Sequence, residues 1–457
     1  MGIIKQEKLA LATFEQFRAS FPEDNDAKGK AFEAFLADWF FLNHPEYKNK
    51  FVKVWRYADW PKPKGVPQQD LGTDLIAKDT EGKICAIQAK FYAADRKIKF
   101  SDIATFLADS SKPYIDYRLL VGTAELANNA KIQLASADKP VYSFLLNRFL
   151  DWDTDWPSSL ADINNHKQRE PYDPKPHQEK AINDVCTKLN GRGQLIMACG
   201  TGKTLTGQRI AEKLEAKTTL VLLPSLLLLR KTVTDWLVEA KQDFLFLPVC
   251  SDKRVTKKTE DEIEIGTSDL GSPATTDSNE IASFIKRRGN KVIFSTYQSS
   301  PKIAEAFTKH SLKPFDLIIA DEAHRCAGKI TSKNKDSDYS TVLKDSLIPA
   351  KHRLFMTATP RIYTASLKKK AENKDIELAS MDDASLFGPV LHHLTFGQAI
   401  TYQPKPLLTD YRVLVIGVNK DSVREMVEER TLVRTEEGVE DDARSLAIQV
   451  GLAKAIR

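Results

Sequence analysis

The chain has 457 residues, of which 42% are hydrophobic and 28% charged, as in ordinary soluble folded proteins. These values exclude a mini-protein, a disordered tail and a fibrous rod, and they leave room for two or three domains. The formal net charge of +5 permits a polyanionic partner but does not require one.

The cysteines indicate a reducing compartment. They are odd in number, widely scattered and without CxxC spacing, which argues against a disulfide framework or a zinc site: Cys85, Cys186, Cys199, Cys250 and Cys326. No apolar secretion signal opens the chain, and its most apolar run, 220–229, is too short to span a bilayer. We therefore expect a cytoplasmic protein without a membrane partner.

The first 150 residues predict a helix, then strands, then further helices. Within them, 73–78 and 84–91 predict a β-hairpin with its turn at 80–83. Gln88 and Lys90 are two residues apart and share one face of the second strand. Asp74 reaches the same place if the first strand curves across it.

A carboxylate beside a lysine at the end of a strand suits phosphodiester hydrolysis. Asp74 and a backbone carbonyl would hold Mg²⁺, and Lys90 would stabilise the attacking hydroxide or the phosphate charge. The alternative is a half-exposed strand whose Gln88 and Lys90 are merely solvated, and these three residues alone do not decide between the two interpretations.

Two motifs together resemble the Mrr-type branch of the PD-(D/E)xK nucleases. One is Asp74 followed by Gln88-Ala89-Lys90, with Gln in the position of the usual acidic residue, and the other is the segment KGKAFE at 28–33. The resemblance implies that Gln88 belongs to the catalytic set and that Glu33 contributes to metal binding.

Cations and aromatic rings alternate between the first helix and the hairpin. Such a mixture is compatible with a nucleic-acid surface. The alternative, which base rates favour for the aromatic residues, is that the rings are core and the lysines solvated. The residues concerned are Lys48, Lys50, Phe51, Lys53, Trp55, Arg56, Tyr57, Trp60, Lys62 and Lys64.

A polar, proline-containing connector at 151–176 ends this region, and we place the domain boundary near residue 165. Short apolar strands then alternate with helices, which predicts a parallel sheet covered on both faces. An exposed loop is expected at 251–280, and a new strand at 411–418. The strands expected in the sheet are 194–197, 219–224, 291–295, 316–321 and 353–358.

The first of these strands leads into a phosphate-binding loop. Gly200 and Gly202 allow the backbone to wrap around phosphates, and Thr201 lies between them. Lys203 would reach the terminal phosphates and Thr204 would bind Mg²⁺. Met197 stands where the strict motif has its first glycine, so a simple glycine-rich turn is the alternative.

An acidic pair follows the strand at 316–321. Asp321 can hold Mg²⁺, and Glu322 can orient and deprotonate the attacking water. Because the carboxyl ends of parallel strands meet at one edge of a sheet, Asp321 and Thr204 can share one metal ion.

Five ordered motifs resemble those of superfamily 2 helicases and translocases: KPHQ at 175–178, PSLLLLRKT at 224–232, FSTYQS at 294–299, DEAH at 321–324 and MTATPR at 356–361. By that resemblance Gln178 contacts adenine, while His324, Thr357 and Thr359 couple hydrolysis to motion. The implied contacts with the DNA backbone are Pro224, Ser225, Thr296, Tyr297 and Gln298.

The whole combination resembles the Type ISP single-chain restriction-modification enzymes. It implies an α/β chain with a nuclease domain and linker at 1–165, a RecA-like ATPase domain at 166–404 and the start of a second RecA-like domain at 405–457. No QxxGRxxR-like segment is present, so we expect a fragment that lacks its arginine finger.

Membership of that bacterial family implies ATP and Mg²⁺ as cofactors and duplex DNA as substrate. It also implies a methyltransferase that binds S-adenosylmethionine and a target-recognition domain farther along the polypeptide, and a second enzyme copy for cleavage. Two other interpretations stay open. One is a helicase or remodeller with a non-catalytic N-terminal domain, and the other is a nucleotide-gated clamp that does not translocate.

Overall fold

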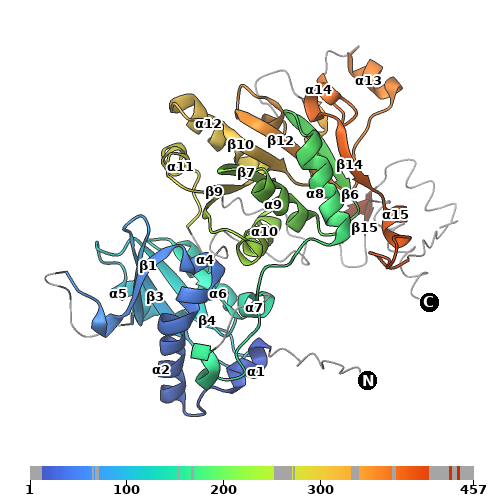
Figure 1. Cartoon of the computed structure of the whole chain (residues 1–457). Coiled ribbons are helices and arrows are strands. Elements are labelled where there is room, and N and C mark those ends of the chain that lie inside the picture. The colour runs from blue at the N-terminus through green and yellow to red at the C-terminus, as the bar shows by residue number, and fades with distance from the viewer. Residues whose placement is uncertain are drawn as a thin grey trace, which may run out of the picture. The chain divides into compact units, whose positions relative to one another are not determined.

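The computed structural model describes residues 13–63, 66, 72–152, 154–165, 169–251, 270, 273–330, 339–372, 377–410, 432–434 and 440–442. Its contacts divide the chain into two compact units, 1–396 and 397–457. The structure is a mixed α/β fold with two larger sheets, both in the first unit (Figure 1).

The N-terminal sheet has five strands in the order β1-β2-β3-β4-β5. The first three strands are antiparallel, while β4 and β5 continue the sheet in parallel. The predicted hairpin is therefore confirmed as β2 and β3. The strands are β1 (Phe51–Arg56), β2 (Leu75–Asp79), β3 (Ile84–Lys90), β4 (Tyr117–Gly122) and β5 (Val141–Phe144).

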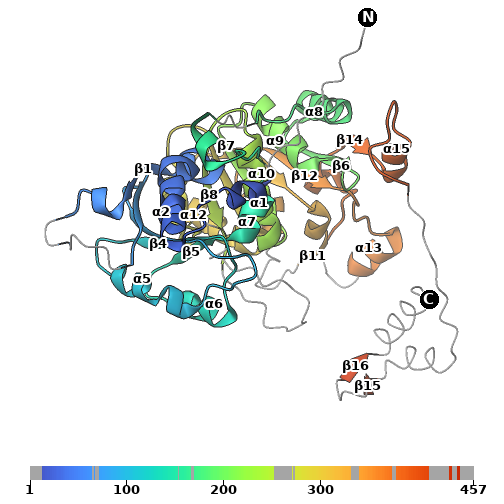
Figure 2. The ribbon, with the colours of Figure 1, turned by 90° about the horizontal axis from the view of Figure 1, so that it is seen from below.

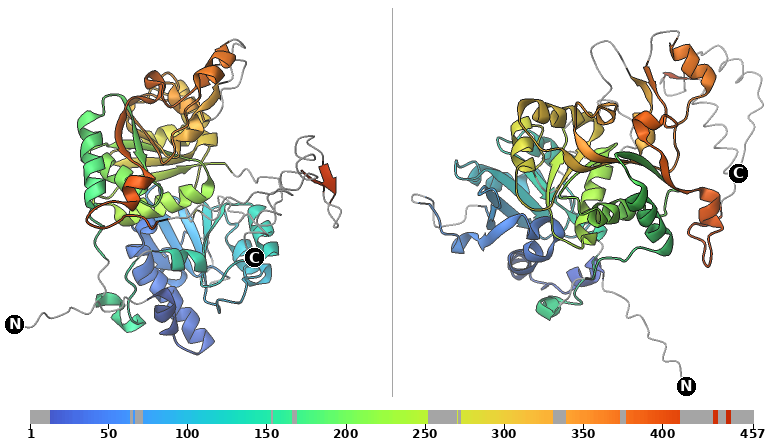
Figure 3. Two further views of the ribbon diagram at one scale, coloured as in Figure 1. Left: turned by 90° about the vertical axis from the view of Figure 1, so that its right-hand side faces the viewer. Right: turned by 45° about the horizontal axis from the view of Figure 1, so that its top comes forward.

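Helices cover both faces of this sheet. Phe32 and Phe35 of α2 pack on the face that carries Ile87, and Phe106 of α5 packs on the face that carries Ala86. Figures 2 and 3 show α5 and α6 together on one side of the sheet. The helices of this region are α1 (Phe14–Ala19), α2 (Asn25–Phe35), α3 (Phe41–Asn43), α4 (Pro45–Lys48), α5 (Ala104–Asp109), α6 (Asn128–Ala135) and α7 (Leu146–Asp151).

The second sheet has seven strands, all parallel, in the order β14-β6-β12-β10-β7-β9-β8. The five apolar strands that the sequence predicts are present within one to three residues of their predicted ends, while β8 and β14 are additions at the two edges. The strands are β6 (Arg192–Met197), β7 (Thr218–Leu223), β8 (Leu245–Val249), β9 (Lys291–Thr296), β10 (Phe315–Ala320), β12 (Ala350–Thr357) and β14 (Val390–Leu394).

Strand alternation divides the core of this sheet between its faces. Ile293 points toward α11 and α12, whereas Phe294 packs edge-on against Trp236 of α10. The green helices α8, α9 and α10 accordingly lie on one side of the sheet and the yellow α11 and α12 on the other (Figure 1). Their bounds are α8 (Pro176–Lys188), α9 (Lys203–Lys213), α10 (Leu226–Glu239), α11 (Ser278–Ile285) and α12 (Ser300–Lys309).

Smaller elements complete the described chain. The short strands β11 (Gly328–Ile330) and β13 (Glu377–Ala379) pair with each other, as do β15 (Leu432–Arg434) and β16 (Glu440–Asp442). The remaining helices are α13 (Ala365–Glu372), α14 (Ala384–Phe387) and α15 (Phe396–Ile400). The predicted strand at 411–418 and most of the predicted loop at 251–280 lie outside the described residues.

A buried ionic cluster fixes the connector before α8. Glu239, at the end of α10, accepts hydrogen bonds from the Arg169 guanidinium and from the Tyr172 N–H, the latter at 2.7 Å. Arg209 of α9 donates to the Tyr172 carbonyl at 2.9 Å, to the Glu239 carbonyl at 2.7 Å and to Glu212 at 2.8 Å. The connector is thus fastened to the helix that follows the phosphate-binding loop.

Within the described part of the chain, no helix is both long and apolar enough to cross a bilayer.

Gly388 joins α14 to β14 at a crowded point of the sheet edge. Its φ is +73°, and a Cβ atom would lie 2.3 Å from the backbone of Arg192. Gly289 has a similar φ of +89° but open space around it.

We expect Gly388→Ala to lower the free energy of unfolding by about 3 kcal/mol or more, because it adds overpacking to backbone strain. Gly289→Ala is the matched control and should cost about 1 kcal/mol from backbone strain alone. Urea titrations of both variants measure the difference between their free energies of unfolding. Equal losses of free energy would show that the backbone around Gly388 shifts to accommodate the added methyl group.

Candidate functional site

The structure places Asp74 beside β3, just before the first residue of β2. Leu75 of β2 pairs with Ile87 of β3. The Asp74 N–H donates to the Ile87 carbonyl at 3.1 Å, and the Asp74 carboxylate accepts the Ala89 N–H at 2.6 Å. The Asp74 carboxylate therefore lies beside Ala89, between Gln88 and Lys90, and strand alternation puts Gln88 and Lys90 on one face of the sheet.

The Gln88 amide is held in one orientation. Its Nε2 donates to the Gly72 carbonyl at 3.0 Å, and the side chain is only 4% exposed. Its Oε1 is buried without a hydrogen-bond partner within the described residues. A buried acceptor that lacks a donor costs about 1–3 kcal/mol, so this oxygen marks a candidate ligand position.

These donors fit a hard divalent cation. Mg²⁺ prefers oxygen ligands and retains several of its waters, so one carboxylate and one amide oxygen make a reasonable partial set. The described residues contain no cluster of three or more His, Cys, Asp or Glu side chains with metal-binding geometry. A cation held here would therefore complete its shell with water and phosphate oxygens.

Lys90 and Glu33 occupy different surroundings. Lys90 is half-buried at the end of β3, on the face of Gln88. Glu33 lies on α2 beside Phe32, and that helix packs on the opposite face, against Ile87 and Ala89. The metal-binding role of Glu33 stays a prediction.

The aromatic residues of the segment before β2 are mainly core. Phe51, Tyr57 and Trp60 are each less than 9% exposed and pack in the two apolar clusters of this domain. Of the cations, Lys48, Lys53 and Arg56 are exposed, and Arg56 pairs with Asp38 at 2.6 Å. Lys50 and Lys62 are half-buried, and Lys64 lies outside the described residues. The core interpretation of these rings is confirmed.

The second site begins at the turn between β6 and α9. Gly202 caps α9 with a φ of +84°, and a Cβ there would lie 2.2 Å from Gln178 Nε2. Lys203 opens the helix with its ammonium 3.9 Å from Cys199 Sγ, and Thr204 follows it half-buried. The N-terminal amides of α9 offer a favourable place for phosphate.

Gln178 and its neighbour His177 brace this turn from α8. Gln178 Nε2 donates to the carbonyls of Thr201 and Gly202 at 3.4 and 3.3 Å. His177 Nε2 lies 2.9 Å from the same Thr201 carbonyl and is buried. His177 was not among the residues predicted for this site, because its partner is a backbone carbonyl 24 residues away.

Asp321 lies at the end of β10 with Glu322 beside it. Burial, reinforced by the neighbouring Glu322 charge, raises the pKa of Asp321 to about 6, although the Lys203 ammonium opposes the shift. The N–H of Glu322 donates to Asp321 Oδ1 at 2.9 Å, and Glu322 has a φ of +49°. Such backbone strain is typical of functional turns.

His324 joins this acidic pair to the neighbouring strand. Its Nδ1 lies 3.0 Å from the Thr357 hydroxyl and 3.3 Å from the Glu322 carboxylate. Thr357 ends β12, and its hydroxyl accepts the N–H of Thr359 at 3.2 Å. The three residues expected to couple hydrolysis to motion are therefore in contact with one another.

The residues expected to contact DNA differ in accessibility. Ser225 is exposed and caps α10 by accepting the Leu228 N–H at 3.3 Å, while Pro224 is buried. Gln298 is exposed and donates to the Tyr339 hydroxyl at 3.0 Å. Thr296, by contrast, is buried, and its hydroxyl donates to Ser299 at 3.1 Å.

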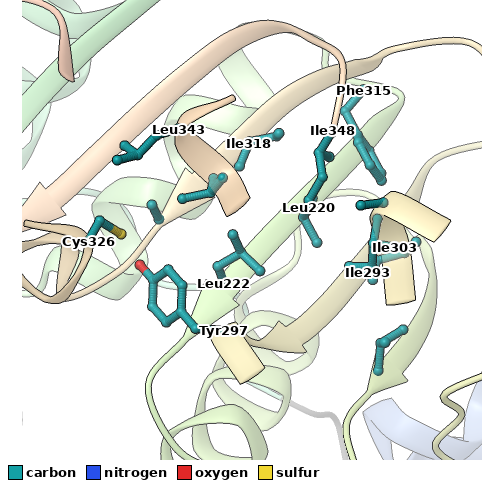
Figure 4. Packing of buried hydrophobic residues seen from close by; sticks show 14 of the residues in the cluster. Leu220, Leu222, Ile293, Tyr297, Ile303, Phe315, Ile318, Cys326, Leu343 and Ile348 are labelled. Carbon is teal, nitrogen blue, oxygen red and sulfur yellow. The ribbon is translucent and has the colours of Figure 1, made fainter. Parts of the chain in front are cut away.

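Tyr297 is fully buried, and its ring lies within the core cluster shown in Figure 4. Its hydroxyl donates to the Asp321 carbonyl at 2.7 Å. Its ring stacks on that of Tyr339, with 5.0 Å between the two ring centroids. Tyr297 therefore lies in the core beneath Asp321 and holds the backbone of the acidic pair through this hydrogen bond. Its contact with DNA stays a prediction.

Comparison with protein families defines the class of both domains. Residues 42–166 match the family described as "Restriction endonuclease", and residues 171–362 match "Type III restriction enzyme, res subunit". The chain therefore joins a restriction-endonuclease-like domain to a RecA-type helicase-like domain.

Among solved structures, the chain is similar to the ATP-dependent Type ISP restriction-modification enzyme LlaBIII bound to DNA. The match has 31% sequence identity and a TM-score of 0.68, and it covers 85% of this chain and 25% of LlaBIII. A nuclease-deletion mutant of the Type ISP enzyme LlaGI with a DNA substrate mimic matches 57% of this chain and 22% of the mutant, at 30% identity and a TM-score of 0.39. The resemblance to Type ISP enzymes is confirmed.

A curated relative is the probable helicase A859L of African swine fever virus (isolate Tick/Malawi/Lil 20-1/1983). It is 26% identical over 345 residues, which is 73% of this chain and 37% of the viral protein. The chain thus spans about a quarter of LlaBIII and little more than a third of the viral helicase.

Replacement of Asp321 by Asn should remove ATP hydrolysis and yet stabilise the fold. An aspartate titrates near 3.9 in an unfolded chain, against about 6 here, so the folded chain loses stability as the pH rises between these values. We expect Asp321→Asn to raise the free energy of unfolding by about 1–2 kcal/mol at pH 8 and by little at about pH 4.

Asp316→Asn, at the other end of β10, is the matched control with the opposite sign. Burial raises the pKa of Asp316, but Lys351 and the backbone amides of Lys217 and Thr218 lower it more, to a net value below the ordinary range. This variant should lose stability at pH 8. Urea titrations without nucleotide measure the free energy of unfolding of both variants. Changes of the same sign would contradict a raised pKa at Asp321 and a lowered pKa at Asp316.

Proposed function

We propose that this chain is the nuclease and motor portion of an ATP-dependent restriction enzyme that moves along duplex DNA and cuts it. The observation that carries the proposal is the hydrogen bond from the Ala89 N–H to the Asp74 carboxylate, which brings Asp74 beside Gln88 and Lys90 in the endonuclease-like domain, ahead of a nucleotide site built from β6, β10 and β12. DNA as substrate is supported by the DNA-bound state of the LlaBIII structure.

In the nuclease centre, the Asp74 carboxylate and Gln88 Oε1 would hold Mg²⁺. When bound, Mg²⁺ supplies positive charge that promotes ionisation of a water and stabilises the leaving oxygen. The chain's own part is to orient these two oxygens through the Ala89 N–H and the Gly72 carbonyl. Lys90 presents its ammonium to the scissile phosphate.

In the motor centre, Lys203 and the first amides of α9 bind the ATP phosphates, and Thr204 and Asp321 would hold the nucleotide's Mg²⁺. Gln178 meets the adenine. Glu322 accepts a proton from the attacking water. His324, which contacts Glu322 and Thr357, couples hydrolysis of the terminal phosphate to movement of Thr357 and Thr359.

The DNA path follows the carboxyl edge of the parallel sheet. The exposed Ser225 and Gln298 meet the phosphate backbone directly, while Pro224, Thr296 and Tyr297 shape the surface beneath. Sequence recognition, methylation with S-adenosylmethionine and the meeting of two enzyme copies belong, in this proposal, to the longer polypeptide.

A second candidate is a DNA translocase whose N-terminal domain binds DNA without cutting it. The observation in its favour is the lack, in the described residues, of a cluster of three or more metal-binding side chains at the Gln88 site. Metal-dependent nicking that requires Asp74 would exclude this candidate.

The proposal predicts that the two activities separate. Asp74→Ala should reduce nicking of supercoiled plasmid in Mg²⁺ or Mn²⁺ by about 100-fold or more and leave ATP hydrolysis unchanged, because the centres lie in different domains. Lys203→Ala should reduce ATP hydrolysis by a similar factor without affecting metal-dependent nicking.

Lys78→Ala, an exposed change on the same hairpin, is the control for non-specific damage. Loss of both nicking and ATP hydrolysis in a well-folded Asp74→Ala protein would contradict the assignment of the two activities to separate domains. Nicking that persists in that variant would refute the nuclease assignment.

A further inference from the structure

The chain leaves β3 immediately after Lys90, so the sheet alone does not fix the position of this residue. Lys90 is the last residue of β3, opposite Gly122 at the end of β4. The segment 91–93 has no regular secondary structure. The direction of the Lys90 side chain therefore depends on what holds the backbone just beyond it.

Thr123 holds that backbone at three points. Its N–H donates to the Lys90 carbonyl at 3.0 Å. Its hydroxyl accepts the Tyr92 N–H at 2.9 Å and donates to the Tyr92 carbonyl at 2.8 Å. A hydroxyl has one donor and two acceptor positions, so this side chain replaces a missing strand neighbour by pairing with both backbone groups of Tyr92.

The surroundings leave these groups little alternative. Thr123 is completely buried and Tyr92 is half-buried, so loss of the hydroxyl would remove the hydrogen-bond partner of a partly buried N–H. Arg18 of α1 donates to the same Tyr92 carbonyl at 2.6 Å, and burial lowers the pKa of this arginine. Two donors from separate elements, the buried Thr123 and the half-buried Arg18, thus converge on one carbonyl, two residues past Lys90.

We infer that Thr123 is a positioning residue for Lys90, an inference that rests on the proposed nuclease function. Thr123 touches neither DNA nor metal; it acts by fixing the backbone from which Lys90 extends. A displacement of about 1 Å at a reacting group can lower a rate by up to roughly 100-fold, so loss of this clamp should affect the chemical step.

The decisive pair of variants is Thr123→Val and Thr123→Ser. Valine keeps the size of threonine and removes the hydroxyl, whereas serine keeps the hydroxyl. We expect Thr123→Val to lower the kcat of metal-dependent plasmid nicking by about tenfold or more, with the KM for DNA and the ATPase rate unchanged. Thr123→Ser should recover most of the lost kcat.

Thr105→Val on α5 is the matched control, because it makes the same chemical change at an exposed position. Nicking by Thr123→Val at the wild-type rate, or a Thr123→Ser protein as slow as the valine variant, would overturn the inference. A rise in the KM for DNA with kcat unchanged would also overturn it.

Amide hydrogen exchange tests the clamp independently of cutting. The Tyr92 amide should be protected in the wild-type chain and in Thr123→Ser, and should exchange about tenfold faster or more in Thr123→Val. If Thr123→Val fails to fold, Arg18→Met removes the second donor to the same carbonyl and should give a smaller loss of kcat.

These measurements also separate this inference from the function on which it rests. A wild-type chain that does not nick DNA at all would refute the proposed function, while the exchange data would still decide whether Thr123 clamps residues 90–92. Unchanged exchange at Tyr92 in the valine variant would refute the clamp whatever the nicking rate.

Discussion

The nucleotide site depends on the lateral pairing of three parallel strands, β6, β12 and β10. Parallel strands present their carboxyl ends at one edge of a sheet. This order therefore puts the turn before Lys203, the Thr357 hydroxyl and the Asp321 carboxylate side by side, although Lys203 is more than a hundred residues before the other two in the chain. The contact between His324 and Thr357 exists only because β12 lies between the other two strands.

The proposed nuclease centre uses antiparallel pairing for the same purpose. The β2–β3 hairpin, in which Leu75 lies opposite Ile87, brings the Asp74 carboxylate to the Ala89 N–H, between Gln88 and Lys90. A shift of register by one residue would turn Gln88 and Lys90 toward the core of Phe32 and Phe35, where their polar groups would have no partners. The packing of Phe32 and Phe35 on the opposite face of the sheet thus fixes the register that keeps Gln88 and Lys90 on the face of the proposed nuclease centre.

Much of this arrangement was predictable from local pattern. The buried strands β6, β7, β9, β10 and β12 are nearly continuous apolar runs, and the hairpin has alternating residues around a Gly-containing turn. The edge strands β8 and β14 escaped prediction, because LFLPV contains a proline and VLHHL two histidines. Edge positions tolerate such residues, since one side of an edge strand has no sheet partner.

Side-chain environment was harder to predict than strand position. Nothing in FSTYQS distinguishes an accessible ring from a buried one, and only the assembled core reveals that Tyr297 lies beneath Asp321. His177 was likewise hidden, because its partner is a backbone carbonyl 24 residues away. Thr123 belongs to no motif, and its clamp appears only once β3 and β4 are paired.

The ionic cluster around Glu239 limits where natural or engineered recombination can exchange the nuclease domain. A junction placed after Tyr172 would take the Arg169 guanidinium and the Tyr172 N–H away from Glu239, and the Tyr172 carbonyl away from Arg209. A junction placed before Arg169 keeps these contacts. Only the second kind of junction yields a motor domain that can accept a foreign N-terminal partner without repair of its interior.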